Sequence, residues 1–220
     1  MELFIGIDQS INSTGLTTEL YNQTELIDKH FYIITGNKKM TKKESNAQSV
    51  YSEFDYVQYD KIEIKEAKNS HEGELFKTHN LINISHTIIA IISSIINKYH
   101  NIDTYTICME GISYQSNNTS SLLDLAGLNY IIRYDLIRFF KDKQFDLIVA
   151  PPGEIKKFAS GNGSAKKDIM ISLFEASHPN LYLIPKIDDI ADSYWMCEYA
   201  KYSARNASKP SRIASNISDE

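Results

Sequence analysis

Acidic residues end or open three short apolar segments that lie far apart in the chain. They are Asp8, Glu110 and the group Asp188, Asp189 and Asp192. Carboxylates at the ends of buried strands and at the start of a helix can converge on one point. A group of three or four carboxylates stays ionised only beside a cation, because like charges raise one another's pKa. The pattern therefore predicts a divalent metal site built from oxygen ligands.

Each of these acids also has an ordinary structural explanation when it is taken alone. Asp8 could equally hydrogen-bond the backbone of a turn. Asp188 or Asp189 could cap a helix N-terminus, where negative charge is favourable. Glu110 is harder to explain in this way, because glutamate is a poor turn former. Asp192 shares a helix face with both Asp188 and Asp189, so the sequence leaves open which of the two acts with it.

Together the carboxylates fit the hydrolysis of a phosphodiester. Two Mg²⁺ ions about 4 Å apart can activate a water molecule and stabilise the leaving 3′ oxygen. Oxygen ligands favour Mg²⁺, with Mn²⁺ as a substitute. His and Cys pairs at the spacing of a zinc site are absent from the sequence. Cys108 and Cys197 lie in apolar runs, so we expect buried free thiols there.

Two polar segments could contact DNA. Gly161 and Gly163 form a loop before a predicted helix. Four lysines flank this loop: Lys156, Lys157, Lys166 and Lys167. Backbone N–H groups and lysines can meet phosphates, although a glycine turn with solvated lysines explains the same residues. Tyr114 and Gln115 follow the second acid and could stack on an unpaired base, or belong to a plain loop and helix cap.

The apolar pattern predicts the elements that position these residues. We expect strands over residues 2–8, 16–21, 26–34, 105–109 and 147–150, an extra strand within 57–64, and a short one over 182–184. We expect a turn over residues 12–15, and helices over 72–99, 120–140, 154–158, 165–176 and 188–204. An antiparallel meander followed by alternating strands and helices predicts an α/β fold, with a mixed sheet and helices on both faces.

Length and composition fit a single domain. The chain has 220 residues, of which 42% are hydrophobic. We expect one catalytic domain over residues 1–204, with a polar insertion at about 35–71 and a polar tail over 205–220. The most apolar stretch, residues 87–96, is interrupted by Ser93 and Ser94 and is too short to span a bilayer, so we expect no membrane partner.

Charge and the first residues bear on partners and location. The net charge of −5 argues mildly against nucleic-acid binding. Lysines and arginines are nevertheless clustered, and clustered charge is what contacts phosphates. The first residues lack the basic region of a secretory signal. We therefore expect a cytoplasmic protein.

Taken in order, these motifs resemble the RuvC family of Holliday junction resolvases, particularly its phage members. Residues 4–10 with Thr14 and Gly15 are similar to the family's first strand and turn. Other matching segments are residues 109–111 (second acidic strand), 117–127 (start of the dimer-forming helix), 150–157 and 161–167 (lysine segment), and 189–193 (final acidic helix). The resemblance covers roughly residues 1–34 and 72–204.

The resemblance implies an RNase H-like fold, dependence on Mg²⁺, a homodimer, and paired nicking of four-way junctions or other branched DNA. It implies catalytic and metal-ligand roles for Asp8, Glu110, Asp189 and Asp192, with Asp188 as an extra acid. DNA contacts carry over to Lys156 and Lys167 in particular. The aromatic residue that the family has just after the second acid is offset here to Tyr114. An Ile-, Asn- and Lys-rich composition suits an AT-rich genome, such as that of a phage. If a phage encodes the protein, we expect it in the cytoplasm of the bacterial host.

Two other functions fit parts of the sequence. Residues 6–10 with 13–15 resemble the first phosphate loop of actin-like and sugar-kinase ATP-binding proteins, but a second such loop is not visible. A non-catalytic relative of the resolvases would bind junctions without cutting them. The same site could also act on RNA–DNA hybrids.

Overall fold

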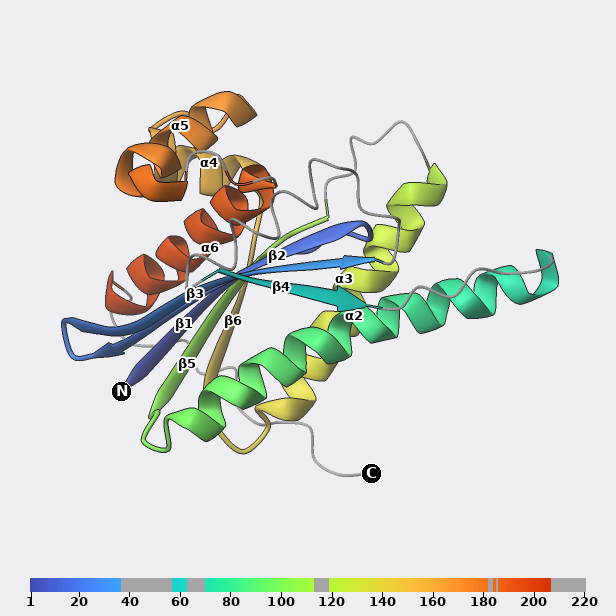
Figure 1. Ribbon diagram of the computed structural model, residues 1–220, viewed down its shortest axis with the longest axis horizontal. Coiled ribbons are helices and arrows are strands. Elements are labelled where there is room, and N and C mark those ends of the chain that lie inside the picture. The colour runs from blue at the N-terminus through green and yellow to red at the C-terminus, as the bar shows by residue number, and fades with distance from the viewer. Residues whose placement is uncertain (37–56, 63–69, 113–118, 182–183, 185, 207–220) are drawn as a thin grey trace.

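The computed structural model describes residues 1–36, 57–62, 70–112, 119–181, 184 and 186–206 (Figure 1). The strands are β1 (Glu2–Asp8), β2 (Ser13–Asn22), β3 (Glu25–Gly36), β4 (Val57–Ile62), β5 (Thr104–Glu110) and β6 (Gln144–Ala150). The helices are α2 (Ser70–Lys98), α3 (Thr119–Phe139), α4 (Pro152–Ser160), α5 (Lys167–Ser177) and α6 (Ile187–Asn206), with a 3₁₀ turn at Pro179–Leu181.

The described strands form one mixed sheet in the order β4-β3-β2-β1-β5-β6. The first three strands are antiparallel neighbours, and β1, β5 and β6 run parallel. Without the edge strand β4, the strand order is β3-β2-β1-β5-β6, which is 3-2-1-4-5 when these five strands are numbered along the chain. The predicted α/β fold and its meander are therefore confirmed. The strand expected within residues 57–64 is present as β4, which pairs in parallel with β3.

The predicted turn over residues 12–15 is wrong, because β2 already begins at Ser13. The turn closes earlier, where Thr14 donates its hydroxyl to the Ser10 carbonyl at 2.7 Å and accepts from the Ser10 N–H at 3.1 Å. Residues 182 and 183 of the expected short strand lie outside the described residues. At the other end, α6 continues to Asn206, so residues 205 and 206 belong to this helix and not to the expected tail.

Alternate residues of β1 and β5 face the two sides of the sheet. Leu3, Ile5 and Ile7 belong to the core cluster that the sheet forms with α2 and α3. Phe4, Gly6 and Asp8 have the opposite phase, because successive side chains of a strand point to opposite faces. Figure 1 shows α6 on that opposite face. Cys108 lies in a separate cluster with Met196 and Ala200 of α6, which gives Glu110 the same orientation as Asp8.

Helix α2 confirms the long helix expected over residues 72–99, with bounds that lie one or two residues earlier. Its residues Glu72–Lys98 have the length and composition that could cross a membrane, with a mean hydropathy of 1.4 in an 18-residue window. A core helix of a folded domain passes the same test. In this structure Ile84, Ile88 and Ile92 of α2 are buried against the sheet, as expected for a helix that covers one sheet face.

Two glycines allow α6 to lie directly on the sheet. A Cβ atom on Gly6 would lie 1.9 Å from the backbone oxygen of Ser193, and one on Gly15 would lie 2.2 Å from that of Asp189. No larger residue fits without moving the helix. Ser193 also meets the Thr17 hydroxyl at 2.8 Å, with both residues buried. These contacts fix the first two turns of α6 against β1 and β2.

A buried ion network fixes α6 further along its length. Glu19 of β2 is 1% exposed, and it pairs with Lys29 of β3 at 2.8 Å and with Lys201 of α6 at 2.7 Å. Burial raises the pKa of this carboxyl, but the two lysines outweigh burial and lower the pKa to about 2. Lys29 and Lys201 thus stabilise this buried carboxylate and hold three elements together, while Lys201 also pairs with Glu198 of α6. Cys108 and Cys197 are buried free thiols, as predicted.

The contact at Gly6 predicts a severe effect of the smallest substitution. Gly6→Ala places a methyl group on the backbone of Ser193 and Cys197, so we expect the free energy of unfolding to fall by about 3 kcal/mol or more. Gly73→Ala in α2 is the matched control, because nothing lies within 4 Å of its Cβ; it should raise stability by about 0.5–1 kcal/mol. Urea unfolding followed by circular dichroism measures both. Equal effects would contradict the close packing of α6.

Candidate active site

Asp8 and Glu110 end two neighbouring parallel strands on the same face of the sheet. The pairing of β1 with β5 runs up to Ile7 and Met109, one residue before each acid. The carboxyl ends of parallel strands meet at one edge of a sheet, which is the usual place for a binding site in an open α/β fold. The two acids, 102 positions apart in the chain, are therefore neighbours in space.

The first turns of α6 bring further carboxylates to this edge. The pKa of the Asp8 carboxyl is raised well above its ordinary value, first by burial and then by the negative charges of Asp192, Glu110 and Asp189. The influence of three acids on one carboxyl shows that β1, β5 and α6 converge here. This is the convergence that the separated acidic segments predicted.

A cavity of about 140 Å³ lies between these elements. Its charged lining consists of Asp8, Glu110, Asp192, Lys156 and Lys167, and its remaining lining of Pro152, Ile155, Met170 and Met196. The apolar part of this lining lowers the polarity around the carboxylates, which strengthens the interactions between charges. Three predicted acids and two predicted lysines thus line the same small space.

Burial and mutual repulsion leave the acids of this cavity short of positive charge. Burial, followed by repulsion from Asp192, raises the pKa of Glu110 although Lys156 and Lys167 oppose the shift. Burial likewise raises the pKa of Asp192 to about 6, against the opposing charge of Lys167. Perturbed carboxyls grouped in a cleft are typical of functional sites.

Lys167 is the cation closest to the α6 acids among the charged groups of the cavity. Its ammonium group lies 2.9 Å from Asp188 Oδ2 and 3.8 Å from Asp192 Oδ2. Lys167 is the first residue of α5, so its position depends on how the preceding loop turns back toward α6. One monovalent cation does not compensate three or more carboxylates, and the pKa of Asp192 stays raised beside it.

The structure distinguishes the three acids of α6. Asp192 alone of the three lines the cavity. Asp189 lies near Asp8, but its Oδ2 accepts a hydrogen bond from Ser13 Oγ at 2.5 Å and lies 4.0 Å from Lys186. Asp188 points to Lys167: burial raises its pKa, but the hydrogen bond and charge of Lys167 outweigh burial and lower it. The charge of Asp189 thus raises the pKa of the Asp8 carboxyl, whereas Asp188 is a partner of Lys167.

The other predicted contact residues have different positions. Lys157 and Lys166 are exposed and do not line the cavity. Tyr114 and Gln115 lie outside the described residues. Gly161 ends α4 in the left-handed conformation, with φ 77°, and its N–H donates to the backbone carbonyl oxygen of Lys157. The helix end by itself therefore accounts for this glycine.

Three residues around the acids were not singled out from the sequence. Ser13 holds Asp189, while Gln9 and Asn129 both donate to the backbone carbonyl of Glu110, at 2.8 and 2.9 Å. Asn129 could have been noticed in the sequence, because it is a polar residue next to Leu128 on the buried side of α3. Gln9 and Ser13 look like ordinary turn residues in the sequence, so only their three-dimensional contacts identify them.

The donor set fits a hard divalent cation. All the acidic side chains in question offer carboxylate oxygens, the ligands that Mg²⁺ and Mn²⁺ prefer. Within the described part of the chain, no three His, Cys, Asp or Glu side chains already stand close enough together to hold one ion. The fit therefore rests on the convergence of the acids and on their raised pKa values, which a divalent cation would lower.

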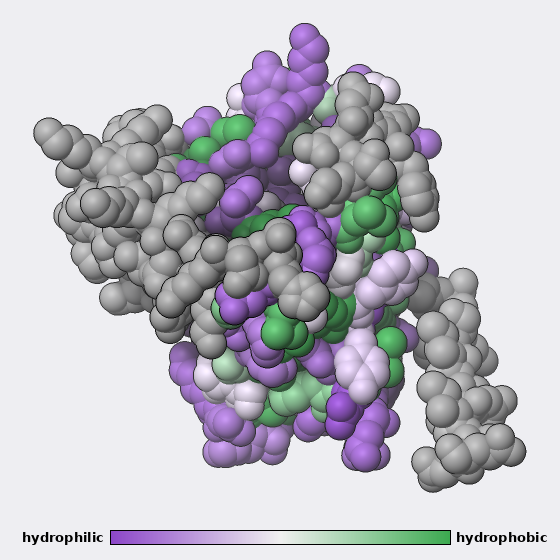
Figure 2. Space-filling model, turned by 90° about the vertical axis from the view of Figure 1, so that its right-hand side faces the viewer, coloured by the Kyte–Doolittle hydropathy of each residue, from purple (hydrophilic) through white to green (hydrophobic). Residues whose placement is uncertain are grey.

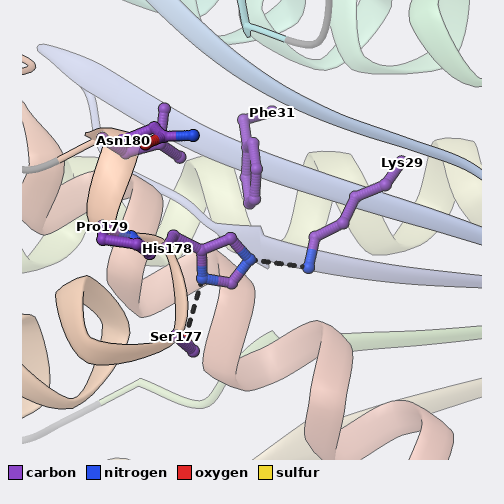
Figure 3. A pocket seen from close by; sticks show the side chains of 7 residues that line it. Lys29, Phe31, Ser177, His178, Pro179 and Asn180 are labelled. Carbon is purple, nitrogen blue, oxygen red and sulfur yellow. Dashed lines mark hydrogen bonds between the residues drawn. The ribbon is translucent and has the colours of Figure 1, made fainter.

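A second, larger cavity of about 280 Å³ lies beside β3 and the end of α5 (Figure 3). His178 lies between Lys29 and Ser177. Its Nε2 is 2.9 Å from Lys29 Nζ, and its Nδ1 is 2.8 Å from Ser177 Oγ. Burial, and then the charge of Lys29, lower the pKa of His178 to about 4, so the ring is neutral at pH 7. Among the described residues, none of the predicted acids or loop lysines lines this cavity.

The chain is distantly similar to several solved structures. No protein-family model and no curated protein matches the sequence. Similar solved structures include Thermus thermophilus RuvC, at 10% identity over 92% of this chain and 95% of RuvC, with a TM-score of 0.47. Yeast mitochondrial Holliday junction resolvase Ydc2 is similar at 16% identity, over 91% and 78% of the two chains (TM-score 0.47). The fowlpox virus resolvase, solved with substrate Holliday junction DNA, shows 15% identity over 91% and 97% (TM-score 0.40).

The raised pKa of Asp192 predicts how stability depends on pH without added metal. A carboxyl whose folded pKa is raised stabilises the fold fully below its unfolded pKa of 3.8, and this stabilisation is lost as the pH rises through about 6. At pH 7.5, Asp192→Asn should therefore be more stable than wild type by on the order of 1–3 kcal/mol. The difference should vanish near pH 4.

Urea unfolding in EDTA at pH 4, 6 and 7.5 measures this dependence. Asp146→Asn, a change at an exposed acid of β6, is the matched control and should show no comparable gain at pH 7.5. Equal stability of Asp192→Asn and wild type at all three pH values would contradict the charge crowding at this site.

Proposed function

We propose that the protein is a divalent-metal-dependent endonuclease that hydrolyses phosphodiesters of branched DNA, above all at four-way junctions. One observation carries the proposal: Asp8, Glu110 and Asp192, from three separate elements, line one cavity together with Lys156 and Lys167. Carboxylates for cations and lysines for phosphates are the groups that this reaction needs.

Asp8, Glu110 and Asp192 are the proposed metal ligands, with Asp189 next to Asp8. Two Mg²⁺ ions per site, with Mn²⁺ as a substitute, fit the number of carboxylates. When bound, the cations supply Lewis-acid chemistry at the phosphate to be cut. Ser13 orients Asp189 by its hydrogen bond, and outer contacts of this kind fix the direction of a ligand. The apolar residues Ile155 and Met170 keep water away from the charges.

The lysines are the proposed phosphate contacts. Lys156 lines the cavity from α4, and Lys167 reaches it from the start of α5. The exposed Lys157 and Lys166 extend positive charge outward along the same two elements. Such contacts position DNA without reading its sequence. The preference for junctions is inferred from the resemblance of the ordered motifs to resolvases, and so is the action as a homodimer.

The phosphate-loop alternative is disfavoured by the hydroxyls that it needs. Ser13 Oγ is engaged with Asp189, and Thr14 Oγ1 is engaged with the backbone of Ser10. Both groups hold parts of this fold together and are not presented to a nucleotide. A non-catalytic relative would have no use for several carboxylates that repel one another.

The proposal predicts metal-dependent cutting of branched DNA. With Mg²⁺, the wild type should nick a four-way junction, and cut linear duplex far more slowly. Asp8→Asn and Glu110→Gln should each lower the rate by about 10³-fold or more, because each removes a charged ligand. End-labelled four-way junction, Y-fork, linear duplex and RNA–DNA hybrid, compared on denaturing gels, give the rates.

Lys157→Gln is the matched control, because this lysine is exposed and lies outside the cavity; it should weaken DNA binding without abolishing cutting. Equal rates for Asp8→Asn and wild type would refute the catalytic assignment. Faster cutting of the RNA–DNA hybrid than of the junction would keep the nuclease and change its substrate.

Helix α3 presents the surface proposed for the second copy of the chain. Leu123, Tyr130, Tyr134 and Ile137 lie along one side of α3 and are each more than half exposed. Figure 2 looks at the side of the molecule where α2 and α3 lie, and shows hydrophobic side chains in several places on that face. The four exposed residues of α3 follow one another at spacings of seven, four and three, which places them on one helix face. A second α3 offers the same residues, as a two-fold interface requires.

The proposed dimer predicts a change of mass on substitution. Tyr134→Glu puts a charge among the exposed apolar residues of α3. It should therefore convert a dimer into a monomer, as measured by sedimentation equilibrium. Leu26→Glu is the matched control, because Leu26 is an exposed apolar residue of β3; it should remain dimeric. A monomeric wild type, or a dimeric Tyr134→Glu variant, would contradict this interface.

A further inference from the structure

Two buried amide side chains donate to one backbone carbonyl at the candidate active site. Gln9 Nε2 lies 2.8 Å and Asn129 Nδ2 lies 2.9 Å from the carbonyl oxygen of Glu110. Gln9 is 6% exposed and Asn129 is fully buried. Gln9 directly follows Asp8 at the end of β1, whereas Asn129 comes from α3. Three elements are thus joined at the residue that carries one of the proposed ligands.

This carbonyl lies where the strand pairing stops. The paired residues of β1 and β5 end at Ile7 and Met109, so the ladder between these strands stops one residue before each acid. Gln9 and Asn129 supply side-chain donors at this point. On the other side, the N–H of Gly111 donates to the carbonyl of Ala150 at 2.8 Å. The peptide group between Glu110 and Gly111 is therefore held at both its oxygen and its nitrogen.

Holding this peptide group restricts the backbone on which the Glu110 side chain is mounted. The same contact ties Glu110 to Gln9, the neighbour of Asp8, and so limits the separation of the two acids. Stability alone does not explain the choice of amides. Gln9 Oε1 and Asn129 Oδ1 find no hydrogen-bond donor among the described residues, and a buried polar atom without a partner lowers stability. An apolar side chain of similar shape avoids that cost.

We infer that Gln9 and Asn129 are positioning residues, which hold the Glu110 carboxylate in place for a divalent cation through the Glu110 backbone. The inference rests on the proposed metal-binding role of Glu110. Neither amide touches the reacting atoms. Outer contacts of this kind typically change metal affinity by about 10- to 100-fold when they are removed.

The test separates a positioning role from a structural one by measuring three quantities on full-length protein. Asn129→Leu keeps the approximate shape, removes the donor and removes the unpaired oxygen. We expect unchanged or higher stability in urea with EDTA, about 10- to 100-fold weaker Mn²⁺ binding by calorimetry, and faster hydrogen exchange at the Gly111 amide in EDTA. Gln9→Met is the second variant and should give the same pattern if Asn129→Leu fails to fold.

Ser85→Ala is the matched control. Ser85 is a fully buried polar residue of α2 that donates to Asp135 at 2.6 Å, away from Glu110. It should lower stability and leave both Mn²⁺ affinity and Gly111 exchange unchanged. The double variant of Gln9 and Asn129 should weaken Mn²⁺ binding by less than the product of the single effects, because both amides bond the same oxygen.

The outcomes distinguish this inference from the proposed function. Wild-type protein that is folded but binds no Mn²⁺ refutes the proposed function. If Gly111 exchange is then equally slow in wild type and both variants, the restraint that the two amides place on the Glu110–Gly111 peptide group is refuted as well. Normal Mn²⁺ binding by wild type and by both single variants overturns the positioning role alone. Weaker Mn²⁺ binding that follows a loss of stability, as in a variant that partly unfolds, also overturns it.

Discussion

The close approach of α6 to the sheet is the contact on which the site depends. Gly6 and Gly15 leave no room for a side chain between β1, β2 and the helix, since a Cβ atom at either position would meet helix backbone within 2.2 Å. Asp189 and Asp192 lie in this part of α6, so the same contact sets their distance from Asp8. A helix packed at ordinary side-chain distance would hold these carboxylates farther from the strand ends, and their mutual effect on pKa would weaken.

The fold compensates at one end of α6 for the electrostatic strain at the other. At the N-terminal end, burial and repulsion raise the pKa values of Asp8 and Asp192. Further along, Glu19 is buried with two lysines, and its pKa is lowered to about 2. The first arrangement opposes folding at neutral pH and the second favours it. Such a division is expected where function requires an arrangement that stability alone would not produce.

The sequence predicts the convergence of the acids better than their individual partners. Strand alternation places Asp8 in phase with Gly6, and Glu110 in phase with Cys108, so the common face follows from a period of two. The choice between Asp188 and Asp189 does not follow from helix spacing, because both share a face with Asp192. Ser13 contacts Asp189 and Lys167 contacts Asp188, and both contacts come from distant segments. The β2 start at Ser13 was missed for a related reason: the Thr14 hydroxyl closes the turn, and propensities do not encode that bond.

The position of Lys167 bears on how the proposed site would change when a cation binds. Its ammonium group pairs with Asp188 and lies near Asp192, so it partly neutralises the acids. In the proposed function the same group contacts a phosphate, and one ammonium cannot serve both partners fully. A divalent cation at the carboxylates would supply more positive charge than the lysine does, and would weaken the hold of Asp192 on it. Metal and DNA would then favour each other's binding, because each relieves a different part of the same charge imbalance.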